Sequence, residues 1–351
     1  MVLSSMIEKL RAVESRLIAV VAILAVLGLS GWHWTVRKAI EERYIQSQLV
    51  HVKDKRAELE SVLGTVYQNI RTITLLPSVK AIKGGNRIDE KEDVVKSGRF
   101  SEEGWATVQQ IYNNLATQVS VSEIYAVIDG LDAKSGQIPF FMFDTLMFGD
   151  QAPNDATDSA SKSTTPDSPE ESEAAEYAYF PQQIEAIKAA YPRFSFAKLD
   201  DIPAFVSPLM RTCDNAQYLS VSHGSEKEAS GVLFSAPFYD NAGGLRGVIS
   251  AILRANLFES LLLGVPFIPV TDEDRAQQRK ANWQLPEPAR FVLGNEKYAI
   301  EIFDRRFPDL PEKIAKGKPG RNVFHMKLNV HSDAPWDLAY YLPDEAIDAD
   351  R

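Results

Sequence analysis

A single uncharged stretch near the N-terminus constrains this chain more than any other feature. Leu17–Val36 is 20 residues long and carries no Asp, Glu, Lys or Arg, and no later segment matches its length and apolarity. A helix of that length covers the roughly 30 Å hydrocarbon core of a bilayer. Trp32 and Trp34 stand where aromatic side chains favour the membrane interface. The sequence therefore predicts a transmembrane helix at 17–36, preceded by a cytoplasmic N-terminus at 1–16.

A cleaved signal peptide is the alternative, since Gly28 and Ser30 are small residues of the kind that precede a cleavage site. The apolar run is longer than the roughly 7–15 residues of a signal core, and the residues after it continue a helical pattern. The uncleaved anchor is therefore the favoured interpretation. Basic residues lie on both sides of the run, so their distribution does not decide the orientation. A large domain that follows a first span is readily translocated, which favours an N-terminus in the cytoplasm.

The residues after the anchor are expected to form a long stalk helix at 37–77. Apolar residues recur at spacings of mostly three and four, the pattern of a helix that packs against another helix. We expect the membrane-near half to pair with a second copy of the chain and Leu63–Leu76 to dock on the chain's own domain. Pro77 should end the helix, because its ring and missing N–H disfavour continuation. The apolar positions are Ile45, Leu49, Val52, Leu59, Leu63, Val66, Ile70 and Ile73.

The overall composition is that of a globular protein with an acidic balance. The chain is 45% hydrophobic and 25% charged, with a formal net charge of −10. Eight acidic residues and one lysine lie in Asp150–Glu176, and 151–176 contains no Leu, Ile, Val, Met or aromatic residue. Such a segment cannot bury enough apolar surface to offset its ordering entropy, so we expect a disordered acidic insertion at 151–176. The acidic surface argues against nucleic acid as a partner.

The remainder predicts an α+β fold with two sheet-and-helix modules, at 78–263 and 286–345. A linker at 264–285 joins them, and a tail at 346–351 follows. The elements are expected from apolar periodicity and from turn residues at their ends. They are helices at Phe100–Gln118 and Pro181–Ala190, strands at Glu123–Ile128, Pro139–Asp144, Gln217–Ser222, Gly231–Asp240 and Leu245–Arg254, a hairpin within 291–304 that turns around Gly294–Asn295, and strands at Asn322–Val330 and Trp336–Leu342.

In this order of parts the chain resembles the double Cache sensor domains of bacterial receptors. These are extracytoplasmic, PAS-like modules of chemoreceptors, histidine kinases and diguanylate cyclases. The most specific match is SAPFYDNAGGLRGVISAILRANLFESLL, Ser235–Leu262, which is similar to the family's strand–turn–strand–helix unit. SEIYAVIDG and WDLAYYLPDE are weaker matches. The resemblance covers about residues 37–345 and implies two PAS-like antiparallel-sheet modules behind a membrane anchor.

The resemblance also implies a ligand site in the larger module. In amino-acid-binding members a Tyr-x-Asp on one strand and a later Asp hold the amine. Tyr218 and Asp240 match these positions, whereas Ser220 stands where the strand Asp would be. Arg193 or Arg211 could face an anionic group by bidentate hydrogen bonding. Each has a structural alternative: Asp240 as a turn residue, Tyr218 as sheet packing, and the arginines as solvated surface residues.

The sequence therefore predicts a periplasmic sensor anchored in the bacterial inner membrane. It would bind a small molecule, such as an amino acid or organic acid, and pass a conformational change to the stalk of a homodimer. The chain has no Walker loop, no dinucleotide glycine fingerprint and no His-Glu-x-x-His, so no enzymatic activity, cofactor or metal is expected. Cys213 is the only cysteine, which excludes an intrachain disulfide.

Two questions stay open at this point. Receptors of the family return through a second membrane helix to an output domain, and this chain reaches AIDADR where that helix would start. The chain is therefore either the input half of such a receptor or a stand-alone sensor with an output-domain partner. The alternative function is an anchored Cache-like interaction protein that binds a partner protein and has no small-molecule pocket.

Overall fold

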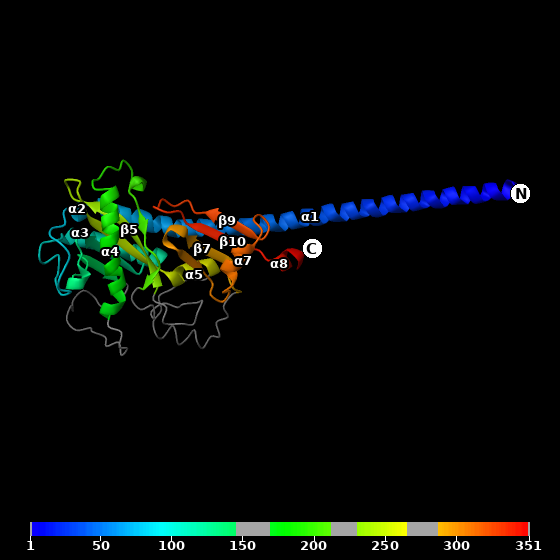
Figure 1. Ribbon diagram of the computed structural model, residues 1–351. Coiled ribbons are helices and arrows are strands. Elements are labelled where there is room, and N and C mark those ends of the chain that lie inside the picture. Colours follow the sequence, from blue (N-terminus) through cyan, green and yellow to red (C-terminus); the bar gives the residue numbers. More distant parts are fainter. Residues whose placement is uncertain (1, 145–168, 212–229, 265–286, 350–351) are drawn as a thin grey trace.

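Two antiparallel sheets lie one after the other along a single long helix, α1 (Val2–Leu75), as Figure 1 shows. The computed structural model describes residues 2–144, 169–211, 230–264 and 287–349. The predicted α+β class, with a long N-terminal helix and two antiparallel sheets, is confirmed. We call 78–263 the larger module and 286–345 the smaller module.

The larger module is built on a sheet of order β2-β1-β6-β5-β3, with β4 also paired to β5. All of its strand pairs are antiparallel. Its elements are α2 (Pro77–Lys80), α3 (Glu102–Val119), β1 (Glu123–Ile128), β2 (Phe141–Asp144), α4 (Pro169–Ala190), β3 (Phe205–Val206), β4 (Met210–Arg211), β5 (Ser230–Tyr239), β6 (Leu245–Arg254) and α5 (Ala255–Leu263).

Different helices cover the two faces of this sheet, because alternate side chains of a strand point to opposite faces. Ile124 of β1 and Phe234 of β5 belong to the face that packs against α1 and α3. Val127 and Leu233 belong to the other face, which packs against Phe180 and its neighbours on α4. A single helix, α4, therefore covers the second face over the described residues (Figure 1).

The smaller module has a four-stranded antiparallel sheet of order β8-β7-β10-β9. One face joins the main core beside α1 and α5, and the other packs against α7. Its elements are β7 (Phe291–Asn295), β8 (Ile300–Phe303), α7 (Leu310–Lys316), β9 (Val323–Lys327), β10 (Asp337–Tyr341) and α8 (Asp344–Ala349).

An aromatic group joins the two modules to α1. Trp336 of the smaller module is fully buried and stacks on Phe234 of β5, with ring centroids 6.1 Å apart, and on Phe258 of α5, also at 6.1 Å. Its indole Nε1 donates a hydrogen bond of 3.4 Å to the hydroxyl of Tyr67 on α1. The largest cluster of buried apolar residues therefore extends through both modules and α1.

The docked part of α1 is longer than the sequence predicts. Side chains from Tyr44 onward pack against the core, and Val52 is fully buried within the single chain. The expectation that docking starts only at Leu63 is therefore wrong. The reason is that the C-terminal module folds back onto this half of the helix, where Tyr340 donates its hydroxyl to Gln48 Oε1 at 2.9 Å.

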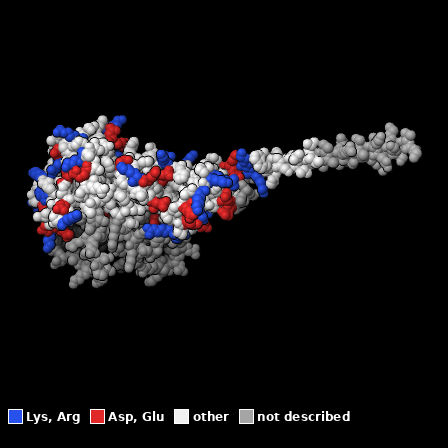
Figure 2. Space-filling view, in the orientation of Figure 1, with Lys and Arg blue, Asp and Glu red and all other residues white. Residues whose placement is uncertain are grey.

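Beyond the two modules α1 projects as an isolated helix (Figure 1). The large apolar side chains described between Val21 and Val36 are 40–72% exposed. Figure 2 shows that the described part of this projection lacks the Lys, Arg, Asp and Glu side chains that are intermixed over the visible face of the modules. Over the residues that the structure describes, no helix has the length and apolarity needed to cross a membrane.

Several predicted elements have the expected bounds, and the acidic segment is the main correction. β1 and β6 match, and α1 ends at Leu75, just before Pro77 opens α2. The segment expected to be disordered is helical from Pro169, where α4 begins, and Glu176 is fully buried. The apolar residues that follow seat α4 on the sheet, so the helix carries the last acidic residues with it.

Other predictions fall on residues outside the described ranges. These are most of the acidic insertion, the strand at 217–222 and nearly all of the linker at 264–285. The predicted hairpin is present as β7 and β8, which pair antiparallel, but its turn lies at 296–299 because Gly294 and Asn295 belong to β7. Helix α7 was not expected from the sequence.

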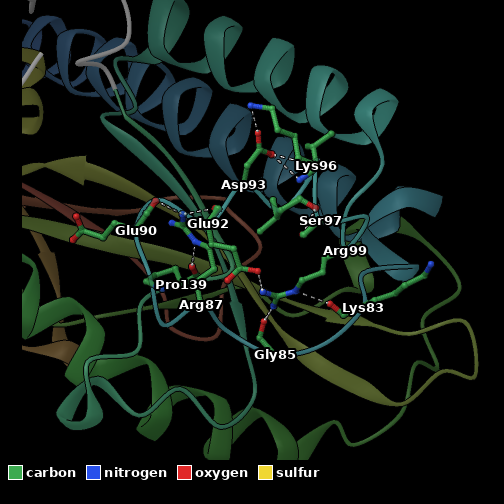
Figure 3. A network of polar contacts seen from close by, with 12 residues as sticks. Lys83, Gly85, Arg87, Glu90, Glu92, Asp93, Lys96, Ser97, Arg99 and Pro139 are labelled. Atoms are coloured by element: carbon green, nitrogen blue, oxygen red, sulfur yellow. Dashed lines mark hydrogen bonds and ion pairs between the residues drawn. The ribbon is translucent and has the colours of Figure 1, made fainter. Parts of the chain in front are cut away.

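Two arginines hold the connection between α2 and α3 in place, as Figure 3 shows. Arg99 donates to backbone carbonyls within this connection and pairs with Glu92. Arg87 donates a hydrogen bond of 3.1 Å to the carbonyl of Pro139, which precedes β2. Because these guanidinium groups are bonded to backbone carbonyls, we assign the network a structural role.

Candidate functional site

A row of polar side chains interrupts the apolar face beneath α4. Glu123 and Tyr125 of β1 share this face, since they are two residues apart on one strand. Tyr125 lies opposite Ser250 of β6, which in turn lies opposite Ser235 of β5. The two serine hydroxyls are 2.6 Å apart and fully buried. Buried polar groups at the centre of a sheet face need partners, so this row distinguishes the face from an ordinary core.

At one end of the row lies a buried cluster of three charged side chains and one tyrosine, which we call the α4-face cluster. It consists of Glu123, Tyr125, Glu176 and Arg254, and all four are at most 1% exposed. The Tyr125 hydroxyl lies 2.8 Å from Glu176 Oε2 of α4 and also contacts the Glu123 carboxylate. Arg254 Nη2 lies 3.4 Å from Glu123 Oε1. Four groups from three elements, β1, β6 and α4, therefore meet between the sheet and its cover.

The cluster combines hydrogen-bond donors and acceptors of opposite charge. A hydroxyl carries one proton, so Tyr125 donates to only one of the two carboxylates at a time. A buried guanidinium offers several donors in a fixed geometry. The group thus presents carboxylate acceptors and guanidinium donors within one water-excluded place, where polar interactions are stronger than in water.

Asp240 and Arg193, two of the predicted ligand residues, lie elsewhere. Asp240 Oδ1 accepts hydrogen bonds of 2.9 Å from the backbone N–H groups of Ala242 and Gly244, which makes the tight turn between β5 and β6. Arg193 is exposed beside the same turn. β6 runs from this turn to Arg254, so Arg254 of the α4-face cluster lies roughly 30 Å away at the other end of the strand.

Of the other three predicted residues, only Arg211 lies within the described part of the chain. Arg211 in β4 pairs with Ser230 of β5, next to the residue opposite Arg254, so its backbone lies at the cluster end. Tyr218 and Ser220 fall outside the described residues. Their ligand roles stay predictions.

Sequence reasoning missed the α4-face cluster, although part of its signal is visible. Glu123 and Arg254 are charged residues at the ends of strands that are otherwise apolar, and Tyr125 shares a face with Glu123. A charge inside a buried strand is costly unless it is paired, which makes it a marker of a site. Glu176 gave no such signal, because it ends a segment whose composition resembles a solvated loop.

A hollow lies on the surface of the smaller module. It has a volume of about 370 Å³ and is lined by Lys313, Lys316, Lys318, Asp309 and Glu312 with four neighbouring residues. Two of its three lysines form ion pairs one helical turn apart, Lys313 with Asp309 and Lys316 with Glu312. These charges offset each other, so the hollow has no distinct preference for a ligand charge. Among the described residues, no group of three or more His, Cys, Asp or Glu side chains is arranged to hold a metal ion.

The solved structures that this chain resembles are sensory and ligand-binding domains. The periplasmic sensory domain of the Campylobacter jejuni chemoreceptor Tlp1 gives a TM-score of 0.43 at 11% identity, covering 84% of this chain and 93% of that one. The sensory domain of the chemoreceptor Tlp3 from the same organism, solved with isoleucine bound, gives 0.40 at 11% identity, covering 89% and 97%.

An extracellular ligand binding receptor from Desulfohalobium retbaense also gives 0.40 at 11% identity, over 82% of this chain. This chain spans only 38% of that receptor's length. The neighbours include domains of a histidine kinase and of a GGDEF protein, the kinds of receptor named by the sequence resemblance. At these TM-scores the likeness alone assigns no function. No protein-family model and no curated protein matches the chain.

Proposed function

We propose that the protein is a membrane-anchored sensor whose larger module binds a small molecule between the sheet and α4. The observation that supports this most directly is the α4-face cluster. Four polar side chains, two of them carboxylates and one a guanidinium, are buried within the otherwise apolar face that α4 covers. Replacing such groups by apolar residues is often neutral or stabilising, so their presence favours a role in recognition.

The ligand class follows from the groups that face it. Glu123 and Glu176 are acceptors for an ammonium group, and Arg254 is a donor for a carboxylate. A molecule that carries both, such as an amino acid, would replace part of the bonding between α4 and the sheet. Arg211 is proposed as a further donor at this end, whereas Asp240 keeps its role in the turn.

The anchor and the compartment complete the proposal. The uncharged run at 17–36, together with the exposed apolar side chains on the projecting part of α1, supports insertion in a bilayer. The two modules would then lie in the periplasm of a bacterium, and a homodimer would form along the projecting part of α1. Ligand binding shifts the modules only as far as the ligand prefers one arrangement of α4 over another.

Thermal unfolding of the full chain in detergent micelles tests the site. The wild type is screened against the protein amino acids, γ-amino acids, organic acids and amines, and a ligand should raise Tm. Glu176→Gln should abolish that rise, because it removes one carboxylate. Glu185→Gln is the matched control, since Glu185 lies on the same helix with a side chain that is 70% exposed, and it should leave the rise intact.

Two outcomes contradict the proposal. One is a chain that unfolds cooperatively but is stabilised by no compound. That result favours the alternative function, an anchored protein that binds a partner protein and has no small-molecule pocket. The other is a ligand whose stabilisation survives in Glu176→Gln, which places the site elsewhere in the molecule.

A further inference from the structure

The free edge of β3 is where α4, α1 and the smaller module meet. β3 is the last strand of the larger sheet in the described chain, so its outer edge pairs with no strand there. Such an edge presents backbone carbonyls that need other partners. The carbonyl of Val206 in β3 and those of Ile202 and Ala204, just before the strand, each accept from a different part of the protein.

The first two donors tie α1 and the smaller module to this edge. Arg71 of α1 is 2% exposed and donates through Nε to the carbonyl of Ile202 at 2.7 Å. The same guanidinium donates through Nη2 to the carbonyl of His331 in the smaller module at 2.6 Å. The backbone N–H of Asp333 donates to the carbonyl of Ala204 at 2.8 Å.

The third donor belongs to α4. The Tyr179 hydroxyl donates to the carbonyl of Val206 at 3.4 Å, one turn of helix after Glu176. The carboxylate of Asp333, whose side chain is 10% exposed, accepts from the Tyr298 hydroxyl and from Lys297. Burial and this bond raise the pKa of Tyr298, and burial together with the nearby Asp333 raises the pKa of Tyr179.

We propose that the free edge of β3 couples α4 to α1. A change in how α4 lies on the sheet would alter the bond of Tyr179 to Val206. Because Ile202 and Ala204 belong to the same extended segment, that change would reach the bonds of Arg71 and Asp333. The coupling thus follows contiguous hydrogen-bonded groups and biases α1 and the smaller module together. It rests on the proposed ligand site, because α4 is the cover of that site.

Hydrogen exchange of the ligand-free full chain in detergent micelles, followed by mass spectrometry, tests the coupling. Tyr179→Phe removes the hydroxyl donor and should speed exchange by roughly three- to fivefold in α1 around Arg71 and in 331–334. Tyr341→Phe, the same substitution at a half-buried tyrosine of the smaller module outside this junction, should leave both segments unchanged. If faster exchange in Tyr179→Phe stays confined to α4 and 202–207, the coupling is refuted.

Tyr298→Phe provides the test from the opposite side. It removes the donor to Asp333 and a hydroxyl that lies beside the Val206 backbone and near Tyr179, and it should speed exchange in α4 by a similar factor. Wild-type exchange in α4 would overturn the proposal. Both measurements need no ligand, so their failure leaves the binding test unaffected, and failure of the binding test leaves these results standing.

Discussion

Arg254 lies at the junction between β6 and α5, a helix that contacts the smaller module. It is the last residue of β6, where its side chain pairs with Glu123, and it immediately precedes α5. One turn later Glu259 of α5, which is 3% exposed, lies 3.9 Å from Arg305 of the smaller module. A shift of the Arg254 guanidinium therefore bears on the start of the helix that connects the sheets.

Tyr239 gives a prediction at the scale of one residue. Its hydroxyl donates to the carbonyl of Tyr191 at 3.0 Å, and burial raises its pKa from 10.0 to about 12. A raised folded-state pKa contributes stability that is present below pH 10 and is lost as pH rises toward 12. We expect the wild type to have a higher free energy of unfolding than Tyr239→Phe. This difference should be constant from pH 8 to about 10 and should shrink above pH 10.

Urea unfolding at a series of pH values measures this difference in free energy of unfolding. Tyr239→Phe serves as the reference at each pH, because it lacks the hydrogen bond throughout and has no phenolic proton to release. A difference that stays constant up to pH 11.5 would contradict the assignment.

Side-chain roles were harder to predict than the strands that carry them. Apolar runs bounded by turn residues identified β1 and β6, but which charged residue is buried depends on what covers the sheet. That cover, α4, begins inside a segment without large apolar residues. The burial of Glu176 was therefore beyond prediction from composition, whereas the turn role of Asp240 was foreseen as an alternative to ligand binding.

At the scale of elements, the apolar repeat of α1 does not reveal which partner the helix packs against. A seam with spacings of three and four suits either a second helix or a sheet of the same chain, and periodicity does not distinguish them. In this structure the apolar side of α1 packs against the sheets of its own chain. The smaller module folds back onto the helix, where Asn329 donates its N–H to Glu60 Oε1 at 2.6 Å. Contacts between residues so distant in sequence leave no local signal.

Gly64 in α1 provides the prediction for this scale. A Cβ added at Gly64 would meet no atom within 4 Å, and a glycine inside a helix costs about 0.5–1 kcal/mol relative to alanine. Gly64→Ala should therefore raise the free energy of unfolding by about 0.5–1 kcal/mol in urea titrations. Gly104→Ala in α3 is the contrast, because its Cβ would lie 2.5 Å from Ser78 Cβ and should destabilise. A loss of stability in Gly64→Ala would contradict the packing described for α1.

At the scale of the whole molecule, the shared core predicts a single unfolding unit. Trp336 of the smaller module packs between residues of β5 and α5 and bonds to α1. The two modules should therefore unfold together in urea, with far-UV circular dichroism and pulse-labelled hydrogen exchange of 291–342 giving one midpoint. Trp336→Ala should lower the free energy of unfolding by roughly 3–5 kcal/mol. Earlier loss of protection in 291–342 of the wild type would show independent modules.

The way α1 is held has a mechanical consequence. From Glu41, which pairs with Arg321 at 2.6 Å, to Leu75 the helix is fixed to both modules, so sliding past either would break many contacts at once. The part before Glu41 is roughly 60 Å long at the rise of an α-helix. It acts as a lever arm: a tilt of about 5° at the body displaces its far end by about 5 Å. A small reorientation of the modules is thereby amplified where the helix ends.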